Sequence, residues 1–116
     1  MNSEELKGRT KKFAHRCVKL SITLPKTVLG GHINKQLIRC STSVASNYRA
    51  ACIAQSKASF ISKLSIALEE ADESYFWLEF IIDEKLMKKE LVVPLLVEAK
   101  ELTSIFIASR KTARHK

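Results

Sequence analysis

Apolar side chains recur every three or four residues along most of the chain, which is the period of a helix that buries one face. The first clear example runs over residues 4–24, where one side carries Leu6, Phe13, Cys17, Leu20 and Leu24. Only three glycines and two prolines interrupt the 116 residues, too few for the turns of a many-stranded sheet. The sequence therefore predicts an all-α protein.

Breaks in this period predict four helices within a single domain. A chain of this length can bury one hydrophobic core without a metal or a disulfide. Four amphipathic helices predict a four-helix bundle that occupies residues 1–116. We expect a frayed basic tail at residues 112–116 and helices at about residues 4–24, 33–54, 57–86 and 88–111.

Proline, glycine and serine mark the expected helix boundaries. Pro25 ends the first helix, and Gly30 and Gly31 belong to a flexible connection before the second. Ser56 can cap the third helix, because its hydroxyl can accept a hydrogen bond from an early backbone N–H. Pro94 leaves two possibilities: the fourth helix starts close to the proline, or it starts earlier and bends there.

The third predicted helix is apolar nearly all round. One apolar stripe runs from Phe60 to Ile82, but a second set of apolar side chains lies outside it, including Phe76, Trp77 and Phe80. One bundle core cannot cover both sides of a helix. We therefore expect the bundle to self-associate, with Phe76, Trp77 and Phe80 at the interface between copies.

The net charge of +8 is concentrated in the first half of the chain. Residues 1–63 hold 12 Lys and Arg against 2 Asp and Glu, whereas residues 64–116 hold 8 against 10. Such a field attracts phosphates, although a solvated helix face can carry it too. Because few aromatic side chains accompany these cations, any binding should follow the nucleic-acid backbone with little sequence preference. The candidate phosphate-binding residues are Lys7, Arg9, Lys11, Lys12, Arg16 and Lys19.

Several other classes of function find no support in the sequence. No run of about 18 apolar residues predicts a membrane span, and charged residues break up the first 24 positions of the chain, which argues against a signal peptide. The three cysteines, Cys17, Cys40 and Cys52, form no C-x-x-C pair, are typical of core residues and suit a reducing cytoplasm. We expect no cofactor and no metal, because no Glu-x-x-His pair occurs and the histidines are scattered at His15, His32 and His115.

Polar residues in the middle of the second and third helices predict a network between them. It would join Asn47, Tyr48 and Arg49 to the acidic cluster on the third helix, namely Glu69, Glu70 and Glu73. Such a network can bind a ligand, or it can be a partly buried ion pair that fixes helix register or subunit pairing. The structural interpretation is favoured, because no nucleophile or base accompanies these residues.

Longer motifs carry a family resemblance. They are LIRCSTSVASNYRAA at residues 37–51, SKASF at 56–60, EEADESYFWLE at 69–79, RTKKFA at 9–14 and LP at 24–25. Together they resemble the bacterial four-helix-bundle family of 23S rRNA-intervening sequence proteins. The resemblance implies an antiparallel, up-and-down four-helix bundle that assembles into a ring-like homopentamer. It also implies a distant similarity to the accessory protein of diversity-generating retroelements, a basic pentamer that engages nucleic acid and a reverse transcriptase. Many family members carry glycine where this chain has Ser41 and Ala45.

The expected function is that of a non-enzymatic, homo-oligomeric adaptor. Its partners would be other copies of itself and nucleic acid, or a protein that acts on nucleic acid, reached through the basic surface. The alternative is a helical-bundle ribonuclease, because Arg110 and His115 have the Arg-x-x-x-x-His spacing in which histidine transfers a proton and arginine stabilises phosphate charge. Their place in a basic tail without apolar neighbours argues against it.

Overall fold

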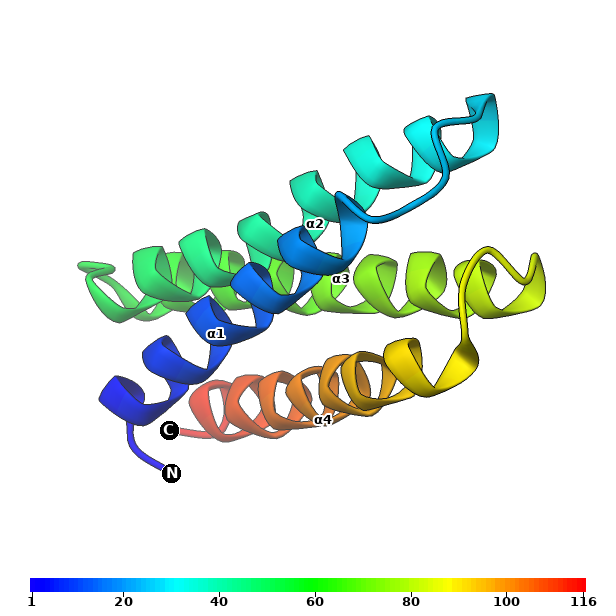
Figure 1. Ribbon diagram of the computed structural model, residues 1–116. Helices are drawn as coiled ribbons and strands as arrows, with labels where there is room; N and C mark the ends of the chain where they lie inside the picture. Colours follow the sequence, from blue (N-terminus) through cyan, green and yellow to red (C-terminus); the bar gives the residue numbers. More distant parts are fainter.

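The computed structural model describes residues 1–116 as four α-helices without strands. Helices run alternately up and down the bundle, which measures 47 × 20 × 19 Å (Figure 1). Both chain ends and the α2–α3 connection lie at one end, and the other two connections lie at the opposite end. The predicted all-α four-helix bundle is confirmed. The helices are α1 (Ser3–Ser21), α2 (Val28–Cys52), α3 (Lys57–Asp83) and α4 (Lys89–Arg114).

Helices that follow one another in the chain pack together, and α1 also meets α4, which closes a square. The backbones of the diagonal pairs, α1 with α3 and α2 with α4, do not approach each other closely. α2 and α3 share the largest interface, whereas α1 and α4 share the smallest. All four helices supply the core, as its fully buried members from successive helices illustrate: Cys17, Leu37, Val44, Leu64, Leu78, Leu102 and Phe106.

The connection between α1 and α2 differs from the prediction at both ends. α1 stops at Ser21, four residues before Pro25, because tight three-residue turns follow it. α2 begins at Val28, five residues earlier than expected, since the Thr27 hydroxyl accepts a hydrogen bond of 3.0 Å from the backbone N–H of Gly30. Gly30 and Gly31 therefore lie in the first turns of a helix, and the predicted flexible connection there is wrong.

Gly30 has a steric role in this connection. A Cβ atom at Gly30 would lie 1.9 Å from the carbonyl oxygen of Pro25, so only glycine allows the chain to pass so close to α2. At Gly31 a Cβ atom would meet nothing within 4 Å. The two adjacent glycines thus differ, and only the first is required by the geometry.

The ends of α3 follow recognisable capping rules. Ser56 caps its start as predicted, because its hydroxyl accepts a 3.0 Å hydrogen bond from the backbone N–H of Ser59. α3 ends at Asp83, three residues earlier than expected. Lys85 adopts a φ of 53°, and the backbone N–H of Leu86 returns to the carbonyl of Ile81 at 3.1 Å. This Schellman motif terminates the helix without glycine.

α4 resolves the ambiguity at Pro94. The helix starts at Lys89, before the proline, and continues through it, so a start near Pro94 is wrong. α4 also extends to Arg114, three residues beyond the predicted end, so residues 112–114 are helical. Basic side chains in the last turn favour this extension because they face the negative end of the helix dipole. The Lys57 ammonium donates to the carbonyl of Lys116 at 2.8 Å.

The three cysteines are unpaired, with Cys17 and Cys40 fully buried in the core and Cys52 half-buried. Burial raises the pKa of the Cys17 thiol far above its usual range and that of the Cys40 thiol to about 11. Both thiols therefore stay protonated and act as small apolar residues. None of the four helices combines the length and the apolarity that crossing a membrane would need.

Candidate functional site

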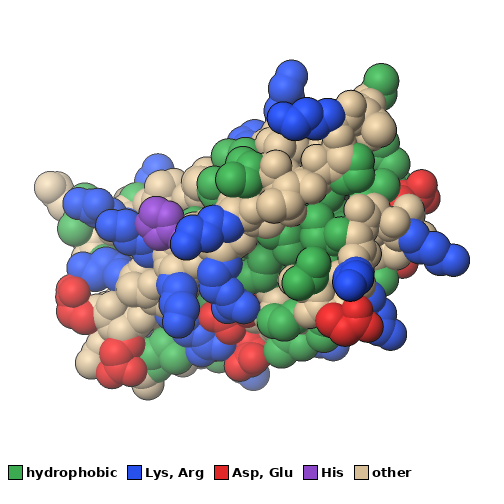
Figure 2. Space-filling model, viewed as in Figure 1, with side chains coloured by type: hydrophobic (Ala, Val, Ile, Leu, Met, Phe, Trp, Pro, Cys, Tyr) green, Lys and Arg blue, Asp and Glu red, His purple; other side chains and the backbone are tan.

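Basic side chains gather on α1 (Figure 2). Lys11, Lys12 and Lys19 are exposed and Arg16 is half-buried. None of the four belongs to an ion pair within the chain. We call these four residues the basic face. Hydrophobic side chains occupy the surface on the right of the same view, where α1 has already ended.

The other two candidate cations on α1 have partners. The Lys7 ammonium lies 2.6 Å from the carboxylate of Glu4, one turn away. Arg9 makes two hydrogen bonds of 2.7 Å with the carboxylate of Glu98 and one of 3.1 Å with that of Glu101, both on α4. The bonds to Glu98 raise the pKa of the Arg9 guanidinium further above its already high range. Arg9 thus lies in an ion pair between helices and not on the open basic face.

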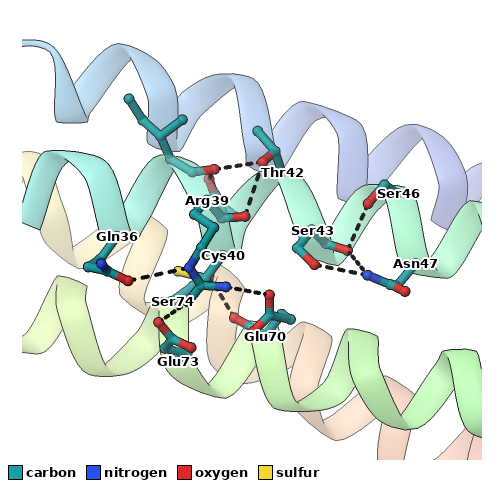
Figure 3. A network of polar contacts seen from close by, with 12 residues as sticks. Gln36, Arg39, Cys40, Thr42, Ser43, Ser46, Asn47, Glu70, Glu73 and Ser74 are labelled. Atoms are coloured by element: carbon teal, nitrogen blue, oxygen red, sulfur yellow. Dashed lines mark hydrogen bonds and ion pairs between the residues drawn. The ribbon is translucent and has the colours of Figure 1, made fainter.

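The polar network between α2 and α3 is built around Arg39 (Figure 3). Its guanidinium donates to Glu70 at 2.9 Å and also to Glu73. The indole N–H of Trp77 donates to the same Glu73 carboxylate at 3.2 Å. Burial alone would raise the pKa of Glu73, but the hydrogen bonds from Arg39 and Trp77 lower it below its usual range. Glu73 is therefore held as a carboxylate by two donors.

The structure places the other predicted members of this network elsewhere. Asn47 donates to the carbonyl and the hydroxyl of Ser43, on its own helix, at 3.0 and 2.9 Å. Tyr48 is buried and stacks on Phe106 of α4, with ring centroids 5.7 Å apart. Arg49 and Glu69 are exposed and belong to no ion pair. The predicted carboxylates of Glu70 and Glu73 do bridge the helices, but with Arg39 in place of Arg49.

Comparison with known proteins matches the model of the family described as 23S rRNA-intervening sequence protein over residues 5–108. The chain belongs to this family. A solved relative, a protein of unknown function from the S23 ribosomal protein family of Bacteroides thetaiotaomicron, is 34% identical and superposes with a TM-score of 0.85. The alignment covers 96% of this chain and 99% of that one. No curated protein matches.

Two positions where other 23S rRNA-intervening sequence proteins are expected to carry glycine lie where α2 meets α1. Ser41 is fully buried next to Cys17 of α1, and its hydroxyl donates to the carbonyl of Ile38 at 3.4 Å. Ala45 lines a groove between the two helices together with Ala14 and Val18. Small side chains at both positions keep α1 and α2 close, so this departure from the family pattern is accommodated within the same fold.

The predicted interface aromatics form one cluster on this member of the 23S rRNA-intervening sequence protein family. The rings of Phe76 and Trp77 meet edge to face at 4.9 Å, and Phe80 lies 6.0 Å from Trp77. His32 of α2 also packs against Trp77, with ring centroids 5.4 Å apart. Trp77 and Phe80 are half-buried, whereas 49% of Phe76 is exposed. Phe76 is therefore the member of this cluster that a second molecule can reach most fully.

The two residues of the candidate ribonuclease pair have different surroundings. Arg110 lies on α4 and donates to the hydroxyl of Ser65 on α3 at 3.3 Å. His115 follows the last residue of α4 and is exposed. The Arg110 side chain makes its hydrogen bond with Ser65 and not with His115. The structure brings together no group of three or more His, Cys, Asp or Glu residues with metal-binding geometry.

Proposed function

We propose that this member of the 23S rRNA-intervening sequence protein family is a non-enzymatic, homo-oligomeric adaptor that binds the phosphate backbone of nucleic acid. The observation that carries the proposal is the basic face. Lys11, Lys12, Arg16 and Lys19 project from one helix without a carboxylate partner in the chain, while Arg9 beside them is neutralised. The four cations lie within nine residues of α1, about 12 Å along the helix axis, so several of them can contact one phosphate strand.

The character of the basic face supports backbone binding over base recognition. Phe13, the aromatic residue of α1, is buried in the core and cannot stack on a base. Lysine and arginine without such a platform contact phosphates and contribute little sequence preference. We therefore infer that binding is electrostatic, tolerant of sequence and strongly dependent on salt.

Self-association completes the proposed function. The half-exposed Phe76 and the surrounding aromatic cluster offer an apolar contact to a second copy. The family resemblance implies a ring of five copies, and a ring repeats the basic face around its circumference. We place this assembly in the cytoplasm, where thiols remain reduced, because all three cysteines are unpaired.

Replacing Lys12→Glu together with Lys19→Glu tests the nucleic-acid proposal. Both side chains are exposed on the basic face and make no ion pair, so the fold should tolerate the change. We expect affinity for a labelled single-stranded RNA of about 30 nucleotides to fall at least tenfold, and the salt slope to flatten by about two. Fluorescence anisotropy between about 50 and 500 mM salt measures both quantities.

The matched control is Lys100→Glu with Lys111→Glu, which makes the same change in net charge on exposed positions of α4. This control should lose much less affinity than the α1 variant. Equal losses in the two variants would mean that the net charge, and not the basic face, attracts the nucleic acid. The same samples also report on catalysis, because RNA that stays intact during the titration is expected of a non-enzymatic protein.

A further inference from the structure

A groove of about 770 Å³ runs between α1 and α2 on the outside of the bundle. Its floor consists of small or apolar residues, chiefly Ala14, Val18 and Ala45. Three cations also line it, Lys7 and Lys11 from α1 and Arg49 from α2, together with Glu4, which pairs with Lys7. Lys11 and Arg49 belong to no ion pair. The groove therefore fits an occupant that is apolar along its centre and acidic along its flanks.

α3 presents such a surface on its exposed side. Steps of three or four residues bring one set of exposed side chains onto a single face of this helix. None of its four carboxylates pairs with a cation in the chain, and its central ring, Phe76, is 49% exposed. We call this set the acidic stripe: Glu69, Asp72, Phe76, Glu79 and Asp83.

We propose that the acidic stripe of one copy docks in the α1–α2 groove of the next, so that Phe76 lies on the groove floor between the cations that line it. The inference rests on the self-association proposed above and specifies its surfaces. The two surfaces are complementary in charge, because unpaired carboxylates meet unpaired Lys11 and Arg49. Phe76 supplies the aromatic anchor that commonly dominates such an interface.

The placement of the two surfaces determines the kind of assembly. Groove and stripe are different surfaces of one molecule, so the contact is head to tail, and each copy both offers a stripe and receives one. The groove lies between α1 and α2, and the stripe lies on α3, which packs against α2. Head-to-tail contacts close a ring when the rotation between successive copies adds up to a full turn, and the ring that the family resemblance implies is of this kind.

The two surfaces have similar lengths. The stripe runs from Glu69 to Asp83 on α3, and the α1 side of the groove runs from Glu4 to Val18, so each extends over about 21 Å of helix. Of the basic face, Lys11 is covered by the neighbouring copy, whereas Lys12, Arg16 and Lys19 do not line the groove and stay open to nucleic acid when it is filled.

Charge reversal on each surface tests the pairing. The groove variant carries Lys11→Glu and Arg49→Glu, and the stripe variant carries Asp72→Lys and Glu79→Lys. Each places like charges opposite one another, and we expect its mass, measured by light scattering after gel filtration, to fall from that of the oligomer to that of a single chain. A protein with all four substitutions restores opposite charges, and we expect it to regain the mass of the wild-type assembly.

Three further measurements separate the outcomes. Far-ultraviolet circular dichroism confirms that each variant is still helical, and the Lys12→Glu, Lys19→Glu protein should keep the wild-type mass. If the fourfold variant does not fold, a mixture of the groove and stripe variants should form a species heavier than either alone. Wild-type mass in both single-surface variants, or no recovery on swapping or mixing, would overturn the pairing but leave self-association intact. A monomeric wild-type protein would overturn both.

Discussion

Two edges of the bundle carry the same polar motif in different surroundings. At the α1–α4 edge, Arg9 lies between Glu98 and Glu101, and at the α2–α3 edge, Arg39 lies between Glu70 and Glu73. In each case the two glutamates are one turn apart on the partner helix. The α1–α4 interface is the smallest in the bundle and the α2–α3 interface the largest. The arginine–glutamate contacts therefore make up a larger part of the α1–α4 interface than of the α2–α3 interface.

The burial of the two arginines follows the opposite order. The Arg9 side chain is 26% exposed and the Arg39 side chain 48%, while their partners Glu98 and Glu70 are both 15% exposed. An exposed ion pair contributes little to stability, while a shielded bidentate pair contributes more and leaves a costly charge behind when broken. Packing therefore dominates the contact between α2 and α3, whereas the small edge between α1 and α4 depends more on the ion pairs of Arg9. α1 is also the helix that carries the basic face.

The strongest test of how α1 is attached lies in its connection to α2. Gly30→Ala places a methyl group 1.9 Å from the carbonyl oxygen of Pro25, so the backbone of the connection has to move. We expect a loss of about 1–3 kcal/mol in the free energy of unfolding, because overpacking of this kind forces backbone shifts. Urea denaturation followed by circular dichroism measures it.

Gly31→Ala is the matched control for this change. The new methyl group meets nothing within 4 Å, and the position lies inside α2. Replacing a helical glycine by alanine should therefore stabilise the protein by about 0.5–1 kcal/mol. If both alanine variants were stabilised, the close approach of Pro25 to α2 would not exist in solution, and α1 would be less constrained than the structure indicates.

The second test breaks the α1–α4 ion pair. Arg9→Ala leaves the shielded carboxylate of Glu98 without its two hydrogen bonds, and we expect a loss of about 1–3 kcal/mol. Arg39→Ala removes the exposed counterpart and should cost less than about 1 kcal/mol. Amide hydrogen exchange should show faster exchange confined to α1 in the Arg9 variant. Equal losses for both arginines would mean that burial does not distinguish the two edges.

Much of this architecture could be predicted from the sequence, but the pairing of polar residues could not. Helical periodicity gives the buried face of each helix, and the Ser56 cap has a local signal that the structure confirms. Arg39 and Arg49 are ten residues apart on α2, which turns them by about 80° around the helix axis. Choosing between them requires the register of α2 against α3, and that register depends on packing across the core.

The position of Gly30 and the partners of Arg9 also differ from what single residues indicate. Thr27 supplies a cap that draws Gly30 into α2, but glycine taken alone indicates a break. Glu98 and Glu101 share a helix face one turn apart, yet nothing in a single sequence says that Arg9, about 90 positions away, lies opposite them. Local capping signals and periodicity are read directly from the residues. Contacts between helices distant in sequence become visible only in the folded bundle.

The smallest expected effect concerns Glu73 and acid. Its pKa in the folded protein is lowered by Arg39 and Trp77, whereas an unfolded glutamate titrates near about 4.3. A lowered folded pKa adds stability above the unfolded pKa, and this stability is lost as the pH falls through the folded pKa. Because Glu73 is one-third exposed, solvent screening should keep its contribution below about 1 kcal/mol.

Glu73→Gln should therefore be slightly less stable than the wild type between pH 5 and 7, and the difference should vanish in urea unfolding at about pH 3. A difference that persists unchanged at acid pH would come from the shape of the side chain, and the α2–α3 edge would then owe nothing to the charge of its ion pair.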